Sequence, residues 1–165
     1  MLNATGSASR FLPINGDYQQ FGLHPDGSLH DANERMQTKM AALANMGVPP
    51  LFRNRSVIDV GCDHGFFSFW AAQCGAVSVL GLDRNRVVRG KGKVDLIEHN
   101  TGVARQFDRF RRVQFRKIDL GLQWHEYPPA EVVMAMSLYH HVFSQVRDHL
   151  PIWYWLGRHV WPGGF

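Results

Sequence analysis

Cysteine is scarce in this sequence, and no apolar run is long enough to cross a bilayer. The two cysteines, Cys62 and Cys74, indicate reduced thiols in a cytoplasmic protein rather than a disulfide framework. There is no CxxC pair or Cys/His cluster, so no metal site is expected. A membrane span needs roughly 18 apolar residues, and the first residues lack a secretory pattern. We therefore expect a soluble intracellular protein without a membrane partner.

Two nucleotide-binding patterns are absent as well. The motif GxxxxGK[ST] is missing, which excludes a P-loop site. The glycine run at residues 61–66 is GCDHGF rather than GxGxxG, and Asp63 stands in place of the middle glycine. A carboxylate there would repel a pyrophosphate but attract an amino group or a sulfonium. An oxidoreductase domain that binds an adenosine dinucleotide is therefore a disfavoured alternative.

The composition is that of one globular domain. Of 165 residues, 45% are apolar and 19% are charged, which argues against disorder. Glycine and proline punctuate residues 1–30, so we expect an irregular amino-terminal arm there and a core over residues 31–165. Asp31 is expected to cap a first helix that ends at Gly47. The formal charge of +4 permits an acidic partner such as RNA.

From Ser56 onward, apolar strands alternate with helices. Residues 56–60 are apolar enough for a strand buried on both faces, and a helix at 66–74 and a strand at 77–82 follow. This order is the parallel crossover of α/β folds. The same rhythm predicts later elements, with helices at 94–107 and 144–159 and strands at 113–118 and 132–136. The chain stops at WPGGF, where this rhythm calls for another strand to begin. We therefore expect that the sheet lacks this strand and has an uncovered edge.

The residues around the first predicted strand suggest an adenosine-containing ligand. In open α/β sheets, ligands bind beyond the carboxyl ends of the strands, where Gly61 and Gly65 are expected to lie. Glycine lets the backbone approach a ligand, and the amides at the start of the next helix favour an electron-rich group. Asp83 ends the second strand, where a carboxylate can accept hydrogen bonds from a ribose diol.

The stretch VIDVGCDHGFFSFWAAQCGAVSVLGLD resembles the first motif of the class I S-adenosylmethionine-dependent methyltransferases. Three later stretches are similar to further family motifs, namely FRKIDLG, EVVMAMSLYHHV and HVWPGGF, so that the resemblance covers about residues 50–165. It implies a Rossmann-like methyltransferase fold, with a mostly parallel sheet flanked by helices and truncated at the carboxyl end.

The resemblance also implies a cofactor and a set of site residues. S-adenosyl-L-methionine is the expected cofactor, and methyl transfer is the expected reaction. Asp83 matches the ribose-binding acid, and Asp119 matches an acid near the adenine. The residues expected to bind the cofactor lie at strand ends: Asp59, Gly61, Cys62, Asp63, Gly65, Asp83, Arg84, Asp119, Leu120 and Ser137.

The segment SLYHH, residues 137–141, carries the expectation about the methyl acceptor. It is similar to loops of methyltransferases that act on small molecules and on a tRNA uridine. It lacks the Asn/Asp-Pro-Pro-aromatic tetrad of base-amine methylases and offers no cysteine, so we expect transfer to oxygen of a small molecule or of a nucleotide in RNA. Tyr139, His140 and His141 are the predicted catalytic residues, because histidine can take a proton near neutral pH.

The sequence leaves three features undecided. The basic stretches 84–93 and 105–117 fit either an RNA contact or, as favoured, a solvated face with Phe107 and Phe110 buried. Residues of the arm, including Gln19, are placed either over the site or merely on the surface. The alternative function is the cofactor-binding or partner-binding half of a split or truncated methyltransferase without independent turnover, with a partner chain or a second copy covering the open edge.

Overall fold

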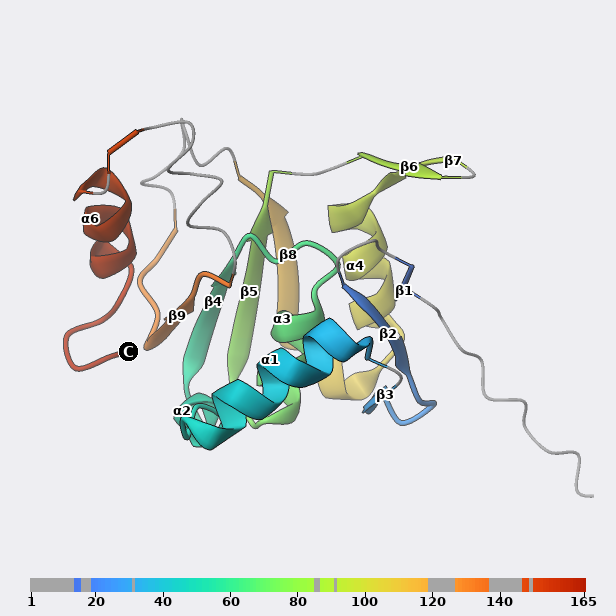
Figure 1. Cartoon of the computed structure of the whole chain (residues 1–165), viewed down its shortest axis with the longest axis horizontal. Coiled ribbons are helices and arrows are strands. Elements are labelled where there is room, and N and C mark those ends of the chain that lie inside the picture. Colours follow the sequence, from blue (N-terminus) through green and yellow to red (C-terminus); the bar gives the residue numbers. More distant parts are fainter. Residues whose placement is uncertain are drawn as a thin grey trace, which may run out of the picture.

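A computed structural model describes most of the chain, namely residues 14–15, 19–30, 32–84, 87–90, 92–118, 127–136, 147–148 and 150–165. Its centre is a four-stranded parallel sheet (Figure 1). The strands are β4 (Ser56–Val60), β5 (Ser78–Asp83), β8 (Val113–Lys117) and β9 (Val132–Met134). All four were predicted from the apolar runs, although β9 ends two residues earlier than expected.

The strand order is β8-β5-β4-β9, so β4 lies between β5 and β9. Ser56 pairs with Ser78 on one side of β4, and Val57 pairs with Val132 on the other. The chain therefore moves outward from β4 through β5 to β8 and then returns to the opposite side of β4. This reversal agrees with the predicted open α/β sheet, and in such sheets ligands bind at the carboxyl ends of the strands beside the point of reversal, which here is the end of β4.

Side chains of the strands alternate between two hydrophobic layers, as the period of a strand requires. Val57, Val79 and Phe115 belong to the layer shared with helices α3 (Phe66–Gln73) and α4 (Leu96–Arg105). Ile58 and Leu82 belong to the opposite layer, which contains Trp155 of helix α6 (Leu150–Arg158). Helices thus cover both faces, and the sheet is buried as parallel sheets usually are.

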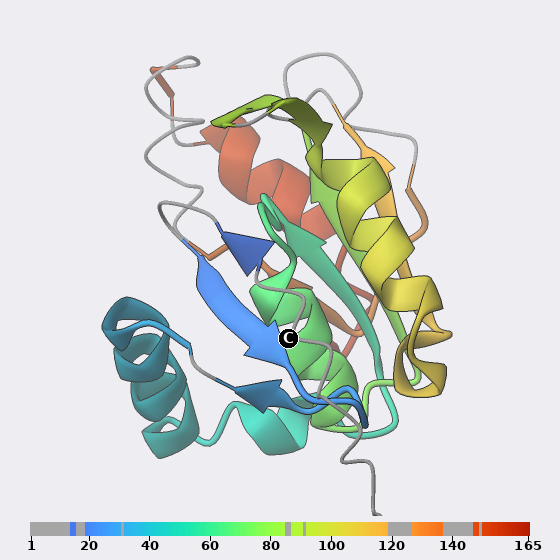
Figure 2. The ribbon, with the colours of Figure 1, turned by 90° about the vertical axis from the view of Figure 1, so that its right-hand side faces the viewer.

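Helix α3 is apolar on nearly every side, with six buried residues from Phe66 to Ala71. Such a helix must be covered on both sides. The sheet covers one side, and strand β2 (Gln20–Leu23) lies along the other (Figure 2). Phe21 of β2 meets Phe66 edge to face, with ring centroids 5.2 Å apart. The amino-terminal arm therefore contributes to the main core.

The expectation of an irregular arm is wrong for the described part of residues 14–30. Strands β1 (Ile14–Asn15), β2 and β3 (Leu29–His30) form an antiparallel sheet. The glycines and prolines that suggested irregularity include those of the turn between β2 and β3, where Gly27 has φ of +80°. Turn residues punctuate a hairpin as readily as a loop.

Helix α1 (Glu34–Asn45) begins later than predicted. Asn33 is the N-cap, and its Oδ1 accepts a hydrogen bond from the Met36 amide at 3.0 Å. The predicted cap at Asp31 is therefore wrong, because the asparagine two residues later bonds to the helix amide. The predicted end is confirmed, since Gly47 follows the helix with φ of +73°. A one-turn helix, α2 (Pro49–Phe52), then leads to β4.

Between β5 and α4 lies a ribbon that the sequence did not predict. Strands β6 (Val87–Gly90) and β7 (Gly92–Asp95) pair antiparallel away from the main sheet (Figure 1). Asp95 then caps α4, because its Oδ1 accepts a hydrogen bond from the Glu98 amide. After α4, the short 3-10 helix η1 (Asp108–Phe110) leads to β8.

The carboxyl-terminal segment lies along β9. The Trp161 amide donates to the Ala130 carbonyl at 2.9 Å, and the Val133 amide donates to the Phe165 carbonyl at 2.9 Å. The expected uncovered edge is therefore paired here with the chain's own residues 159–165. Helix α6 begins at Leu150, and the predicted start at residue 144 lies outside the described residues. Of the two tryptophans in α6, Trp155 is buried and Trp153 is exposed. No helix in the described part of the chain is long and apolar enough to cross a membrane.

Candidate functional site

The loop from Gly61 to Gly65 lies where β4 ends and α3 begins. Its backbone turns sharply, because Gly61, Asp63 and Gly65 all have positive φ, at +74°, +49° and +81°. The amides of Gly61 and Cys62 both donate to the carbonyl of Leu82, at 2.7 and 3.1 Å. These two bonds hold the loop against the end of β5. The sharp turn and its position agree with the sequence prediction.

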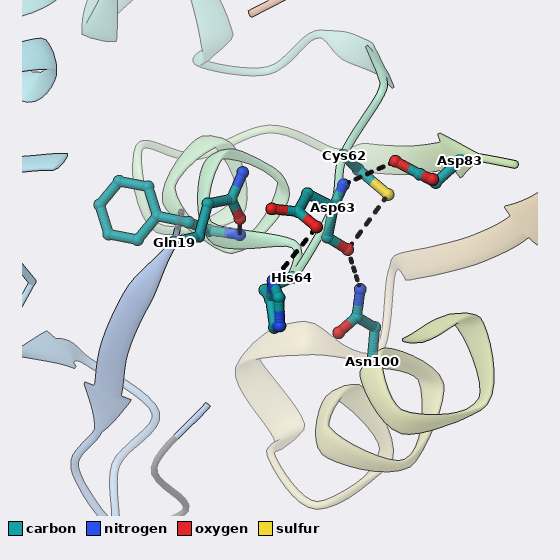
Figure 3. Close-up of polar contacts among 7 residues, drawn as sticks. Gln19, Cys62, Asp63, His64, Asp83 and Asn100 are labelled. Carbon is teal, nitrogen blue, oxygen red and sulfur yellow. Dashed lines mark hydrogen bonds and ion pairs between the residues drawn. The ribbon is translucent and has the colours of Figure 1, made fainter. Parts of the chain in front are cut away.

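Asp83 lies directly beside this loop. Its Oδ2 accepts a hydrogen bond from the Asp63 amide at 2.9 Å (Figure 3). The Asp83 carboxylate, at the end of β5, thus joins this strand to the glycine loop. Arg84 follows and is exposed. The structure brings together most of the residues predicted around the first motif: Gly61, Cys62, Asp63, Gly65, Asp83 and Arg84.

Two polar side chains that were not predicted as site residues contact Asp63 of the loop. His64 is buried, and its Nδ1 lies 3.2 Å from Oδ1 of Asp63, an ion pair when the imidazole is protonated. Asn100 of α4 is fully buried, and its Nδ2 donates to the Asp63 carbonyl at 2.8 Å (Figure 3). Asn100 lies 37 residues from Asp63 in sequence. Only the packing of α4 against the loop brings the two together.

Asp59 is placed differently from the other predicted residues. It lies inside the molecule, and its Oδ2 accepts a hydrogen bond from Ser68 Oγ of α3 at 2.7 Å. Burial raises the pKa of the Asp59 carboxyl to about 7, and the nearby charge of Asp83 adds to the shift. The Asp59 carboxylate therefore bonds to α3, behind the loop.

The electrostatics of the loop are dominated by carboxylates. Asp59, Asp63 and Asp83 surround Cys62, whose thiol is buried. Burial raises the pKa of the Cys62 thiol well above its ordinary value, and the three carboxylates raise it further. Cys62 therefore stays a neutral thiol at physiological pH, and the site favours ligands that bring hydrogen-bond donors or positive charge.

Gln19 connects the arm to this site. Its Oε1 accepts a hydrogen bond from the amide of Phe66, the first residue of α3, at 3.0 Å (Figure 3). Gln19 is 3% exposed. We expected that amide to face an electron-rich ligand group, and this is wrong for Phe66, since the arm supplies its acceptor. Gln19 is therefore buried at the start of α3 rather than placed on the surface, and its closing over a ligand stays a prediction.

Replacing Gln19 by alanine tests this connection. The buried Phe66 amide loses its acceptor, so we expect a loss of about 1–3 kcal/mol in the free energy of unfolding. Gln19→Glu keeps an acceptor at the start of α3 and is expected to lose less. Urea denaturation of both variants measures the difference. An alanine variant as stable as the glutamate variant would contradict the assignment.

Several predicted site residues lie outside the described part of the chain. They are Asp119, Leu120, Ser137, Tyr139, His140 and His141. The strands that precede them are described. The carboxyl end of β8 lies beside Asp83, and that of β9 lies beside β4, so both segments leave the sheet at the edge that holds the glycine loop. The roles of these six residues remain predictions.

Comparison of the structure with solved structures gives two informative matches. An S-adenosylmethionine-dependent methyltransferase from Mesorhizobium loti matches 76% of this chain and 50% of its own, with a TM-score of 0.53 and 22% identity. A structure described as a putative sarcosine dimethylglycine methyltransferase from Galdieria sulphuraria matches 78% of this chain and 44% of its own, with a TM-score of 0.55 and 12% identity. The chain has the class I S-adenosylmethionine-dependent methyltransferase fold.

The sequence of this methyltransferase-fold chain is similar to a curated enzyme as well. Protein arginine N-methyltransferase 1 from Schizosaccharomyces pombe is 32% identical over 83 residues, which are 50% of this chain and 23% of the relative. The chain thus spans about a quarter of that relative's length. No family model matches the sequence. In the described part of the methyltransferase fold, no group of three or more His, Cys, Asp or Glu side chains is placed to hold a metal ion.

Proposed function

We propose that this chain binds S-adenosyl-L-methionine between the Gly61–Gly65 loop and Asp83. The observation that carries the proposal is the Asp83 carboxylate, held 2.9 Å from the Asp63 amide at the carboxyl end of β5. A carboxylate in that position accepts hydrogen bonds from the two ribose hydroxyls. Asp63 and Asp83 suit a cofactor with an ammonium and a sulfonium group, and they disfavour a pyrophosphate.

The reaction that fits this site is methyl transfer. Held by the Gly61–Gly65 loop and Asp83, the cofactor would supply a methyl group on a positively charged sulfur for attack by a lone pair of the acceptor, with S-adenosylhomocysteine as the leaving group. The protein's part is to align the acceptor and to exclude water. The hydrogen bond from the Asp63 amide to the Asp83 carboxylate helps to hold the loop in its turned shape.

For the acceptor, we propose oxygen of a small molecule or of a nucleotide in RNA. The segment after β9 supports this choice, because residues 135–147 contain no Asp or Glu. An arginine acceptor would call for carboxylates around its guanidinium. His140 and His141 offer bases that can take a proton from a hydroxyl. Arginine nitrogen is the second candidate, favoured by the 32% identity to a protein arginine methyltransferase.

Cofactor binding is tested by thermal unfolding with S-adenosylhomocysteine. At about 100 times the dissociation constant, the ligand adds about 2.7 kcal/mol to the free energy of unfolding. For a domain of this size we expect the melting temperature to rise by roughly 5–10 °C. Asp83→Ala should abolish the rise, whereas Asp108→Ala, at an exposed acid of η1, should keep it. The absence of a shift in the unaltered chain, or a shift with NADH instead, would overturn the proposal.

Methyl transfer is tested separately with labelled cofactor. Transfer to a hydroxyl compound or to RNA, and not to an arginine-rich peptide, is expected if oxygen is the acceptor. The alternative is a cofactor-binding or partner-binding half of a methyltransferase without independent turnover. In that case S-adenosylhomocysteine binds, no label is transferred by this chain alone, and transfer appears when a longer carboxyl-terminal segment or a partner chain is added.

A further inference from the structure

Six basic side chains line one border of the molecule, along the end of α4, η1 and β8. They form the basic edge: Arg105, Arg109, Arg111, Arg112, Arg116 and Lys117. All six are exposed. β8 is the outer strand of the sheet, and no described strand pairs with its free side. The three phenylalanines of residues 105–117 point inward, since Phe110 and Phe115 are buried and Phe107 packs against the core.

The charge of the basic edge is concentrated. Residues 105–117 contain one acid, Asp108, which pairs with Arg111 at 2.7 Å. With six basic residues and one acid, this segment carries more positive charge than the whole chain, whose net charge is +4. The rest of the molecule is therefore close to neutral, and a polyanion would be attracted to this border in particular.

The basic edge leads to the proposed cofactor site. Lys117 pairs with Asp83, and neighbouring strands lie about 4.8 Å apart. Arg116 pairs with Leu82, whose carbonyl holds the glycine loop. Arg84, exposed directly after Asp83, continues the basic surface on β5. A strand of phosphates that follows β8 for its length of roughly 17 Å would end beside the ribose-binding acid.

A simpler explanation covers only part of this pattern. Charged side chains on an outer strand prevent association with another sheet. On β8 itself, Arg116 and Lys117 are sufficient for that purpose. Arg105, Arg109 and Arg111 lie on α4 and around η1, outside the strand, where protection of its free side does not require them.

We infer that the basic edge binds the phosphates of single-stranded RNA and delivers a nucleotide to the methyl-transfer site. The inference rests on the proposed function and chooses the RNA acceptor over the small molecule. We choose single-stranded rather than duplex RNA, because chemistry on a base needs that base outside a base-paired stack. The arginines contact phosphates, so binding is expected to depend on salt and little on sequence.

The inference is tested by fluorescence anisotropy with a labelled single-stranded RNA of mixed sequence, between about 50 and 200 mM salt. In the triple variant Arg109→Ala, Arg112→Ala and Arg116→Ala, the slope of log affinity against log salt should fall by about 2. Affinity at the lower salt should fall roughly tenfold or more. Arg53→Ala, at an exposed arginine after α2, is the matched control and should change neither quantity.

Three results would overturn the inference. They are unchanged RNA binding in the triple variant, an equal loss in Arg53→Ala, or equally strong competition by a polyglutamate peptide. If the variant does not fold, hydrogen exchange on the unaltered chain decides the matter, because RNA should protect residues 105–118 and leave α1 unprotected. A triple variant that keeps its response to S-adenosylhomocysteine but loses RNA supports both proposals. If the unaltered chain responds to S-adenosylhomocysteine but does not bind RNA, the RNA site alone is refuted.

Discussion

Replacing Gly65 by alanine is expected to destabilise the folded chain by about 3 kcal/mol, from left-handed backbone strain and overpacking together. Gly65 has φ of +81°, which costs a residue with a Cβ about 1–2 kcal/mol. The new Cβ would also lie 2.9 Å from Cζ of Phe115, closer than real Cβ contacts occur, and 3.2 Å from Phe69, which is closer than most of them. Phe115 is buried in the sheet and has little freedom to move.

Gly47 provides the matched control. It has φ of +73°, but a Cβ there would meet nothing within 4 Å. Gly47→Ala therefore isolates the backbone strain, with an expected loss of about 1 kcal/mol. Denaturant unfolding of both variants gives the difference, which is the packing cost at Gly65. In Gly65→Ala with Phe115→Leu, part of that cost should be recovered. Equal losses at Gly47 and Gly65 would show that Phe115 does not fill this space.

Replacing Asp59 by asparagine is expected to stabilise the chain by about 3 kcal/mol at about pH 8. Burial raises the pKa of the folded-state carboxyl to about 7, from an ordinary value of 3.8. Between these values the folded chain holds a proton that the unfolded chain has released. Stability therefore falls as the pH rises through this interval, by up to about 4 kcal/mol, and the loss is complete above it.

Asparagine removes this loss because it is neutral at every pH, and its carbonyl oxygen can still accept the hydrogen bond from Ser68. The measurement is the free energy of unfolding at several pH values from about 4 to 8. In Asp59→Asn, the free energy of unfolding should no longer show the fall with rising pH that the Asp59 carboxyl causes in the unaltered chain. Asp108→Asn, at an exposed acid, should keep this fall. A decline of the same size in the Asp59 variant would show that the carboxyl is not the titrating group.

The main sheet could be predicted from the sequence because parallel strands buried on both faces are continuous apolar runs. Ser56–Val60 is predicted with the bounds that the structure has. The strands of the arm and the β6–β7 ribbon could not, since they are short and their runs contain glycine and polar residues. Their pairing depends on the surfaces that they meet. The cap of α1 was misplaced because Asp31 and Asn33 are both good capping residues.

The site was predictable where its residues follow strand ends in sequence, as Gly61, Gly65 and Asp83 do. Ser68 and Asn100 could not be predicted, because each depends on how a helix packs on the loop. The sequence also gave no sign that Asp59 would be buried behind the turn, since a strand residue faces one of two layers and the pattern around it is apolar on both. The methyl acceptor is not determined by the fold, because the same fold serves many substrates.

Ser56 and Glu131 bond reciprocally at the beginnings of β4 and β9. Glu131 Oε2 accepts from the Ser56 amide at 2.9 Å, and the Glu131 amide donates to Ser56 Oγ at 3.0 Å. These residues lie 75 positions apart, whereas Ser56 and its partner on β5 lie only 22 apart. Closing the longer loop costs about 1 kcal/mol more in chain entropy. We therefore expect β4, β5 and the glycine loop between them to join first, through short-range contacts, and β9 to be secured later, across 75 positions of the chain.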